Sequence, residues 1–567
     1  MSNAVMSLAA DFDLAGRDQW MELVEQVLRG VPFDKKLVRT TYDGIAVQPL
    51  YTGADHSGDA GLPGMAPFTR GSRLAGGAWQ VRQAHSLQTG NQAVLDDVAG
   101  GADAIELHID GETIWEELAD LLDGVPPAVP IMLAPGSGAA VWPLVDLWDS
   151  WGLLRHETLG GFGLDPRDPA VTEALTYILR LGYPEVLVST VNGAGLADQG
   201  ATEAQELAGS LADAVAYLRA CEQAGIDLAA AADKLEFRYA AGVDQFLTIA
   251  KLRAGRRLWA RVTEACGIEA AAQRQHAVTA GAMMTRRDPW VNMIRTTVAC
   301  FAAAAGGADA ITVSPYDSAL GVPDPLGLRI ARNTQLLLRE ESHIDQVIDP
   351  SGGAYYIESL TDALAGAAWG LFQELEAGAS LAPRIEATRL ARGQDVATRR
   401  LPITGVSEFP DLDEPVVERL PAPIDPELRR LAEPFEALRD AADAAPSRPT
   451  AFLANLGPGA VYTARATFAA NLLAAGGVDA LFGEGFATPA EAAEAWASSG
   501  SSVAVMCSSD EMYQSHAAAT VAALKEAGCG YVLLAGRPDE QWGADGYLYL
   551  GCDALEALGA IHERLGL

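Results

Sequence analysis

Between residues 79 and 314 the hydrophobic positions alternate between two spacings. Short runs in which nearly every residue is apolar are typical of strands that are buried on both faces. Longer stretches between them, such as 202–224 and 242–265, carry apolar residues at helical spacing. Eight strand-like runs that alternate with helices over about 250 residues predict a (β/α)8 TIM barrel. The predicted strands are 79–84, 103–109, 129–134, 152–156, 185–190, 234–240, 274–279 and 308–314.

After residue 449 the same alternation returns on a smaller scale. Five apolar runs alternate with helical patterns, which predicts a doubly wound, flavodoxin-like α/β domain. The predicted strands are AFLANL, DALFG, SVAVMCSS, GYVLLAG and GYLYLG, and the predicted helices are 463–475, 488–497, 511–527 and one from 553 onward. The fold class predicted for the chain is therefore α/β, with the barrel first and the smaller domain last.

The pattern divides the chain into four parts. The first, residues 1–52, is an N-terminal arm with an amphipathic helix, which carries Trp20, Leu23 and Val27, and a hairpin that turns at Asp43-Gly44. The other three parts are the barrel (53–401), a proline-rich linker (402–449) and the flavodoxin-like domain (450–567). The linker holds nine prolines and one predicted helix, 426–444.

The stretch 328–361 changes its pattern twice. Its first half has the apolar spacing of a helix, and Asp349-Pro350 and Gly352-Gly353 then break the chain. The residues 355–357 are predicted to be extended, and a new helix is predicted to begin at Leu360.

The chain is strongly acidic, with a formal net charge of −35 over 567 residues. This charge argues against nucleic acid and anionic membranes as partners. It is also unfavourable for a polyanionic ligand such as coenzyme A, which needs lysine and arginine nearby. Lys251, Arg253, Arg256 and Arg257 form a basic cluster on one predicted helix. The cluster could hold phosphates, but a salt-bridged helix face is the favoured interpretation.

Composition also bears on the cellular compartment. We find no uninterrupted apolar window of about 18 residues, so no membrane span is predicted. The N-terminus has no basic region and carries acidic residues early, unlike a secretory signal. Six cysteines occur without a C-x-x-C pair, which favours neither disulfides nor a zinc site. A reducing, cytoplasmic location is therefore predicted.

In a TIM barrel, the side chains that do chemistry lie where the strands end at the carboxyl rim. His85 and His276 are candidate acid–base groups there, because histidine titrates near neutral pH. The alternative is that each is a rim histidine that only hydrogen-bonds its neighbours. The other polar residues predicted at the rim are Gln83, His108, Thr190, Asn192, Arg238 and Tyr239.

Several stretches resemble, in the same order, the methylmalonyl-CoA mutase family. They are YDGIAVQPLYT, PFTRG, WQVRQ, IAKLRAGRRLW, RQHAVTAGAMMT and IARNTQ, with the later VIDP. The resemblance covers nearly the whole chain, and it implies a mutase-type barrel followed by a cobalamin-binding-type domain. His276 matches a family histidine that contacts substrate. It forms, with Gln83 and His85, a possible vestigial substrate site.

The catalytic positions of the family are not kept. The tyrosine that follows the family's RQ is Ala84 here, and the family histidine is absent near Gly195. In the last domain, the motif D-x-H-x-x-G carries the histidine that ligates cobalt. It is replaced by residues 455–463, which contain neither Asp nor His. The resemblance therefore implies that this chain has no catalytic residue, no cofactor-binding residue and no metal ligand.

This pattern resembles the small, non-catalytic subunit of a heterodimeric methylmalonyl-CoA mutase. The large catalytic partner subunit would carry adenosylcobalamin and interconvert methylmalonyl-CoA and succinyl-CoA by radical rearrangement. The arm and the linker are the expected contact elements. Two alternatives stay open: a divergent barrel enzyme that acts on another acyl-CoA without cobalamin, and a mutase barrel that borrows cobalamin from a separate carrier chain.

Overall fold

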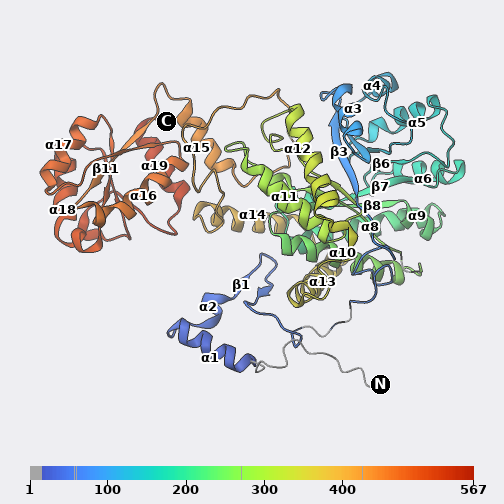
Figure 1. The fold of residues 1–567 in the computed structure, drawn as a ribbon, viewed down its shortest axis with the longest axis horizontal. Coiled ribbons are helices and arrows are strands. Elements are labelled where there is room, and N and C mark those ends of the chain that lie inside the picture. Colours follow the sequence, from blue (N-terminus) through green and yellow to red (C-terminus); the bar gives the residue numbers. More distant parts are fainter. Residues whose placement is uncertain (1–15, 56–57, 59, 270, 424) are drawn as a thin grey trace.

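The larger part of the chain is a closed barrel of eight parallel strands (Figure 1). The computed structural model describes residues 16–55, 58, 60–269, 271–423 and 425–567. The barrel strands are β3 (Gln80–Ser86), β4 (Ala104–His108), β5 (Ile131–Leu133), β6 (Gly160–Leu164), β7 (Val186–Asn192), β8 (Leu235–Ala241), β9 (Arg274–Thr279) and β10 (Ala310–Thr312). They follow one another around the barrel in chain order, and β10 closes it against β3. The predicted TIM barrel is confirmed.

The prediction was wrong for the fourth strand, which is β6 at Gly160–Leu164 and not 152–156. The sequence of β6, GGFGL, does not have the pattern of a strand, because glycine has little preference for strands. The structure needs these glycines because the backbone is crowded. A Cβ atom on Gly160 would collide with the Ile131 carbonyl oxygen and the Trp148 ring. Gly163 has a φ of +60°, a conformation that favours glycine.

Helices cover the outside of the barrel. They are α3 (Asn91–Ala99), α4 (Trp115–Leu121), α5 (Val141–Ser150), α6 (Ala170–Leu181), α7 (Gly193–Asp198), α8 (Glu203–Gln223), α9 (Leu228–Asp233), α10 (Gln245–Ala265), α11 (Val291–Ala305) and α12 (Pro325–Leu336). Two further helices follow: α13 (Tyr355–Glu376), which packs on α8 and α10, and α14 (Ala382–Ala397). Of the helices in the described ranges, none is both long enough and apolar enough to cross a membrane.

The start of α13 corrects the prediction for 355–357, which are helical and not extended. Gly353 has a φ of +82° and ends the preceding turn, and Ala354 is the extended residue before the helix. The Glu358 carboxylate accepts a hydrogen bond from the Gly353 backbone N–H at 2.9 Å. This bond links the helix to the residue before its cap, so the helix begins at Tyr355 rather than at Leu360.

The second unit is a five-stranded parallel sheet with helices on both faces. Its elements are β11 (Thr450–Asn455), α16 (Gly459–Ala475), β12 (Asp479–Phe482), α17 (Pro489–Ser499), β13 (Val503–Cys507), α18 (Asp510–Glu526), β14 (Tyr531–Ala535), β15 (Gly546–Leu548) and α19 (Ala554–Leu565). The strand order β12-β11-β13-β14-β15 confirms the flavodoxin-like prediction. Val505 and Leu533 face one core while Met506 and Leu534 face the other, so the strands are continuously apolar.

The linker joins the two units mostly as irregular chain with turns. Its helix α15 (Glu433–Asp443) is shorter than the predicted 426–444, because the residues before it are bonded to the barrel. The backbone N–H of Arg429 donates to the Asp198 carbonyl oxygen at 2.9 Å. The backbone N–H of Leu431 donates to the Ala282 carbonyl oxygen, also at 2.9 Å. A non-helical segment with turns therefore crosses the carboxyl rim where the pattern predicted a helix.

The N-terminal arm projects from the barrel beside α13 (Figure 1). It consists of α1 (Arg17–Leu28), α2 (Phe33–Leu37) and the short antiparallel strands β1 (Arg39–Thr40) and β2 (Ala46–Val47). Neither helix contains a buried residue. The part of the predicted arm before Gly16 lies outside the described residues.

Candidate functional site

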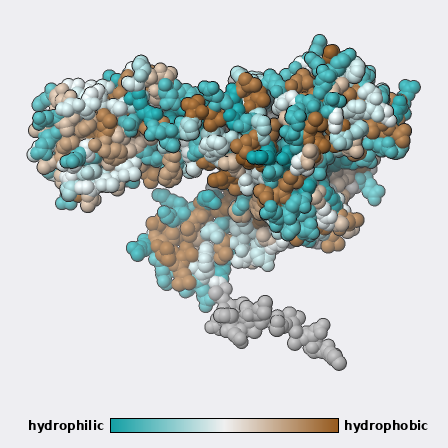
Figure 2. Space-filling view, turned by 45° about the horizontal axis from the view of Figure 1, so that its top comes forward, coloured by the Kyte–Doolittle hydropathy of each residue, from teal (hydrophilic) through white to brown (hydrophobic). Residues whose placement is uncertain are grey.

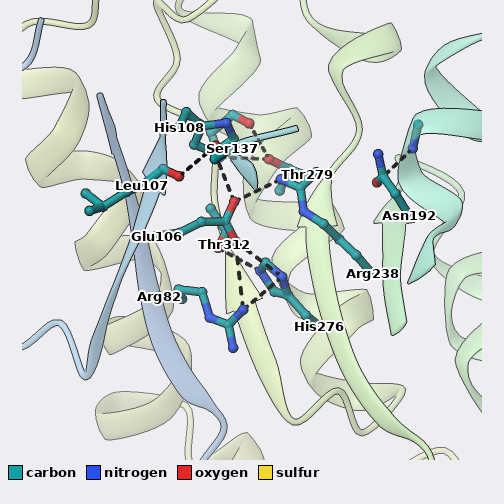
Figure 3. A network of polar contacts seen from close by, with 12 residues as sticks. Arg82, Glu106, Leu107, His108, Ser137, Asn192, Arg238, His276, Thr279 and Thr312 are labelled. Atoms are coloured by element: carbon teal, nitrogen blue, oxygen red, sulfur yellow. Dashed lines mark hydrogen bonds and ion pairs between the residues drawn. The ribbon is translucent and has the colours of Figure 1, made fainter. Parts of the chain in front are cut away.

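Charged and titratable side chains from four strands meet inside the barrel (Figure 3). Arg82 of β3 lies across from Glu236 of β8, and its Nη1 and Nη2 atoms donate to the two carboxylate oxygens at 3.0 and 2.9 Å. The Arg82 side chain is 4% exposed and that of Glu236 is 7% exposed. Two parallel charge-assisted hydrogen bonds hold this buried pair in one geometry.

The Arg82 guanidinium also sets the tautomer of His276. Arg82 Nη1 lies 3.2 Å from His276 Nδ1, and a guanidinium can only donate. Nδ1 therefore accepts this bond, and the ring proton lies on Nε2, which is 2.8 Å from the Thr312 hydroxyl. Burial, reinforced by the Arg82 charge, holds the pKa of His276 well below its usual range. His276 is thus a neutral, completely buried hydrogen-bonding residue.

Glu106 connects this network to the carboxyl rim. Its Oε1 accepts from Arg238 Nη2 at 3.0 Å and lies 2.9 Å from His108 Nε2. Burial alone would raise the pKa of Glu106, but the Arg238 charge and the His108 hydrogen bond hold that pKa well below its usual range. The network reaches solvent at His108, whose side chain is 44% exposed.

The pair of Arg82 and Glu236 divides the barrel interior. On its amino-terminal side lies a pocket of about 670 Å³. Gln80, Met132 and Leu187 line this pocket, which ends at Arg82 and Glu236. These lining residues come from the early parts of their strands, so the pocket opens away from the rim where barrel enzymes place their chemistry.

Gln83 and His85 lie on the other face of β3 and are not brought together with His276. Gln83 Nε2 donates to Asp97 Oδ2 at 3.1 Å, and His85 Nε2 lies 3.1 Å from the same oxygen. Arg332, which lies on α12, forms an ion pair with Asp97. Side chains alternate along a strand, so residues 83 and 85 face the helices while residue 82 faces the axis.

Ala84, the position of the family tyrosine, faces the barrel interior. It is the register partner of Glu106, and directly paired residues of parallel strands point to the same face of the sheet. A methyl group therefore occupies the position beside the Glu106 carboxylate.

The remaining predicted rim residues have structural contacts. Thr190 is buried beside Glu236, and the Asn192 side chain accepts from the Gly195 N–H at the start of α7, at 3.2 Å. The Tyr239 hydroxyl faces the helices and accepts from Gln273 at 3.1 Å.

The basic cluster on α10 is paired within the chain. Lys251 forms an ion pair with Glu206, Arg253 with Asp349 and Glu358, and Arg257 with Asp362. Arg256 donates to backbone carbonyl oxygens, among them Phe68 at 3.0 Å and Gly306 at 2.8 Å. This arrangement matches a salt-bridged helix and leaves these charges committed to the fold.

Sequence reasoning missed Arg82, Glu106 and Glu236 as the centre of the interior network. One signal was available: each is a charged residue in the middle of a run predicted as a buried strand. Buried charges are almost always paired, so three such strands indicate ion pairs across the barrel.

The flavodoxin-like unit is closed at the edge where such sheets bind ligands. That crevice lies outside the carboxyl ends of the strands, where the strand order reverses between β11 and β13. The Ser508 hydroxyl bridges it by donating to the Leu456 carbonyl oxygen at 2.8 Å. Beside it the Tyr513 hydroxyl accepts from the Ser508 N–H at 2.8 Å and lies 3.0 Å from the Ala535 carbonyl oxygen. The Tyr513 side chain is buried and fills this space.

The two histidines of this unit are placed elsewhere. His516 lies on α18, with its Nδ1 at 2.7 Å from the Ser515 hydroxyl. His562 lies on α19, buried, with its Nε2 at 2.7 Å from the Gly476 carbonyl oxygen. Across the described ranges, no group of three or more His, Cys, Asp and Glu side chains could hold a metal ion.

Comparison with known proteins gives a consistent family. A family model described as methylmalonyl-CoA mutase matches residues 168–473. The chain is 46% identical to a methylmalonyl-CoA mutase small subunit of Streptomyces virginiae, covering 99% of this chain and 98% of that protein. It is 36% identical to the small subunit of Propionibacterium freudenreichii subsp. shermanii, covering 100% and 97%. A methylmalonyl-CoA mutase of Rhizobium meliloti is 32% identical over 67% of this chain and 61% of its own length.

Proposed function

Because the chain belongs to the methylmalonyl-CoA mutase family, we propose that it is the small, non-catalytic subunit of a heterodimeric methylmalonyl-CoA mutase. The large subunit would interconvert methylmalonyl-CoA and succinyl-CoA. The observation that carries this proposal is the ion pair inside the barrel. Arg82 and Glu236 pair across the interior at the inner end of the amino-terminal pocket, His276 is neutral and buried, and Ala84 stands where family members have the substrate tyrosine.

The cofactor is expected in the partner subunit, because the residues of this chain do not fit adenosylcobalamin. Residues 455–463 offer no imidazole for cobalt, and the crevice between β11 and β13 is bridged by Ser508. The buried Tyr513 side chain occupies the space beside it. An imidazole ligand and an open crevice are the two features that a cobalamin site of this type requires.

Titration of the purified chain with adenosylcobalamin is expected to give no spectral change of the kind that histidine ligation produces. The physical reason is the lack of an imidazole at residues 455–463. Visible absorption spectroscopy measures this directly, with the large subunit as the positive control. A stoichiometric spectral change with this chain alone would contradict the cofactor assignment.

Co-expression with a large mutase subunit from the same source is expected to yield a one-to-one complex. An obligate interface of this kind buries more than about 2,000 Å². Size-exclusion chromatography with light scattering gives the mass of the complex. An unrelated flavodoxin, co-expressed in place of the large subunit, serves as the negative control. Failure of the two chains to co-purify would overturn the subunit proposal.

The divergent-enzyme alternative is less well supported by the geometry. It would use His276 and His85 together, but these residues lie on opposite faces of the barrel wall. The third possibility, a barrel that borrows cobalamin, would need the substrate tyrosine that Ala84 replaces.

A further inference from the structure

Residues 425–431 of the linker, which we call the rim strap, lie against the carboxyl rim of the barrel and form neither helix nor strand. Three hydrogen bonds join the rim strap to the barrel: the Arg429 N–H to the Asp198 carbonyl oxygen, the Leu431 N–H to the Ala282 carbonyl oxygen, and Gln199 Nε2 to the Glu427 carboxylate, each at 2.9 Å. They reach the loops that follow β7 and β9. Because the rim strap has no regular structure of its own, contacts with the barrel set its position.

The rim strap also covers a carboxylate. Gly281 lies between Leu428 and Asp198: a Cβ atom on it would be 2.9 Å from the Leu428 side chain and 3.3 Å from Asp198 Oδ1. Leu428 is therefore packed over the Asp198 carboxylate at the rim. Asp198 Oδ1 is buried and has no hydrogen-bond partner among the residues that the structure describes. Burial of this kind penalises the ionised form of a carboxylate.

The charged groups that act on Asp198 come from both sides of the contact. Burial, the largest cause, and the Asp425 carboxylate of the rim strap raise the pKa of Asp198 to about 6, against the Arg238 charge from β8 and nearby backbone N–H groups. The other charged side chains of the rim strap have partners elsewhere: Glu427 on Gln199, Arg430 on Glu436, and Arg429 on the Pro426 and Leu428 carbonyl oxygens. The rim strap thus brings one carboxylate, Asp425, near another that is already buried.

The linker is fixed on both sides of the rim strap. Before it, Arg419 forms an ion pair with the buried Asp317, in the loop after β10, at 2.5 Å. After it, the Glu436 carboxylate of α15 accepts from the Arg286 backbone N–H at 2.6 Å. The barrel and the flavodoxin-like unit, which the linker joins, lie side by side (Figure 2). The rim strap can therefore open between two fixed points while both units stay folded.

We propose that the rim strap is a pH-sensitive closure of the carboxyl rim, which opens as a unit and closes more tightly when the Asp198 carboxylate beneath it takes up a proton. When closed, it covers the sector of the rim from β7 to β9. When open, it exposes Asp198 to solvent. This closure goes beyond the proposed function and does not depend on it, because all its parts belong to this chain.

The direction of the pH dependence follows from the two states of Asp198. Its pKa is about 6 under the closed rim strap, and an exposed aspartate has a pKa of about 3.9. The closed state therefore binds more protons, so a fall in pH favours closing. Between pH 7.5 and pH 5.5, the closing equilibrium is expected to shift about fourfold toward the closed state.

Hydrogen exchange of the full-length chain, followed by mass spectrometry, tests the closure. The reporters are the backbone N–H groups of Arg429 and Leu431, with rates corrected for the intrinsic pH dependence of exchange. Wild-type protection is expected to be about fourfold higher at pH 5.5 than at pH 7.5. D198N keeps the shape of the side chain without its charge. It is expected to raise protection at pH 7.5 at least about tenfold and to remove the pH dependence.

E427Q is the matched control. It removes the charge of another carboxylate of the rim strap, while its amide oxygen can still accept from Gln199. Protection in E427Q is expected to equal that of the wild type at both pH values. L428S removes the apolar cover of Asp198, and it is expected to lower protection at both pH values.

PH-independent protection in the wild type, or unchanged protection in a folded D198N, would overturn the closure. Loss of the pH dependence in E427Q would assign it to Glu427 and would overturn it too. If the circular dichroism spectrum shows that D198N is not folded, D425N decides instead. D425N keeps the oxygen that accepts from the Glu427 N–H, and it is expected to raise protection at pH 7.5. Protection in D425N at or below the wild-type value would contradict the closure, and none of these results bears on the subunit assignment.

Discussion

Replacement of Arg82 by methionine is expected to destabilise the folded chain by about 3–5 kcal/mol. Arg82 is the bidentate partner of Glu236 and the donor to His276 Nδ1, and all three side chains are almost completely buried. Removal of the guanidinium leaves a buried carboxylate without its partner. The free energy of unfolding from urea titration, followed by tryptophan fluorescence, measures this loss.

The companion variants separate an ion-pair effect from a packing effect. Replacement of both partners, R82M/E236M, is expected to recover more than half of the loss, since a buried pair exchanged for apolar residues of similar size costs little. R274M is the surface control: Arg274 pairs with Asp233 at 3.2 Å and both side chains are about half exposed. Its expected effect is below about 0.5 kcal/mol. An R82M chain as stable as the wild type would contradict the network described inside the barrel.

The sequence pattern predicted best the strands that are buried on both faces. The nearly continuous apolar runs of β11, β13 and β14 indicate this burial directly. The miss at β6 has the opposite cause: close backbone approach selected glycine, which removes the side chains that a pattern detects. The helix start at Tyr355 was missed because two aromatic residues suggested a strand, while the Glu358 bond to Gly353 favours a helix.

The candidate site was less predictable than the fold. The sequence analysis placed Gln83, His85 and His276 together at the rim. In the structure, Gln83 and His85 face outward and contact Asp97, whereas His276 contacts Arg82 inside the barrel. The partners of a buried charge come from strands far apart in the sequence, such as Arg82 and Glu236, and only the closed barrel brings them together. The loss of an imidazole at residues 455–463 needed no structure, because it is a matter of residue type.

The lone chain is expected to have no isomerase activity, even with adenosylcobalamin and methylmalonyl-CoA in excess. Radical rearrangement needs positioned groups around the substrate, and a misplacement of about 1 Å can already cost about 100-fold in rate. Here an ion pair lies across the barrel interior and the tyrosine position holds Ala84. The complex with the large subunit is expected to turn over substrate, because that subunit supplies the site.

His276 offers a matched control within this experiment. H276N keeps an oxygen at the position of Nδ1 that can accept from Arg82, and it removes the imidazole together with the Nε2 contact to Thr312. If His276 only holds the barrel together, the complex containing H276N keeps the turnover of the wild-type complex. Loss of turnover with an intact circular dichroism spectrum would assign His276 to the chemistry instead.

The most direct test of the non-catalytic assignment is succinyl-CoA formation by the purified chain, measured by chromatography with and without the large subunit. We predict no product above the enzyme-free blank from the chain alone and clear turnover from the one-to-one complex. Sustained adenosylcobalamin-dependent formation of succinyl-CoA by the chain alone would contradict it.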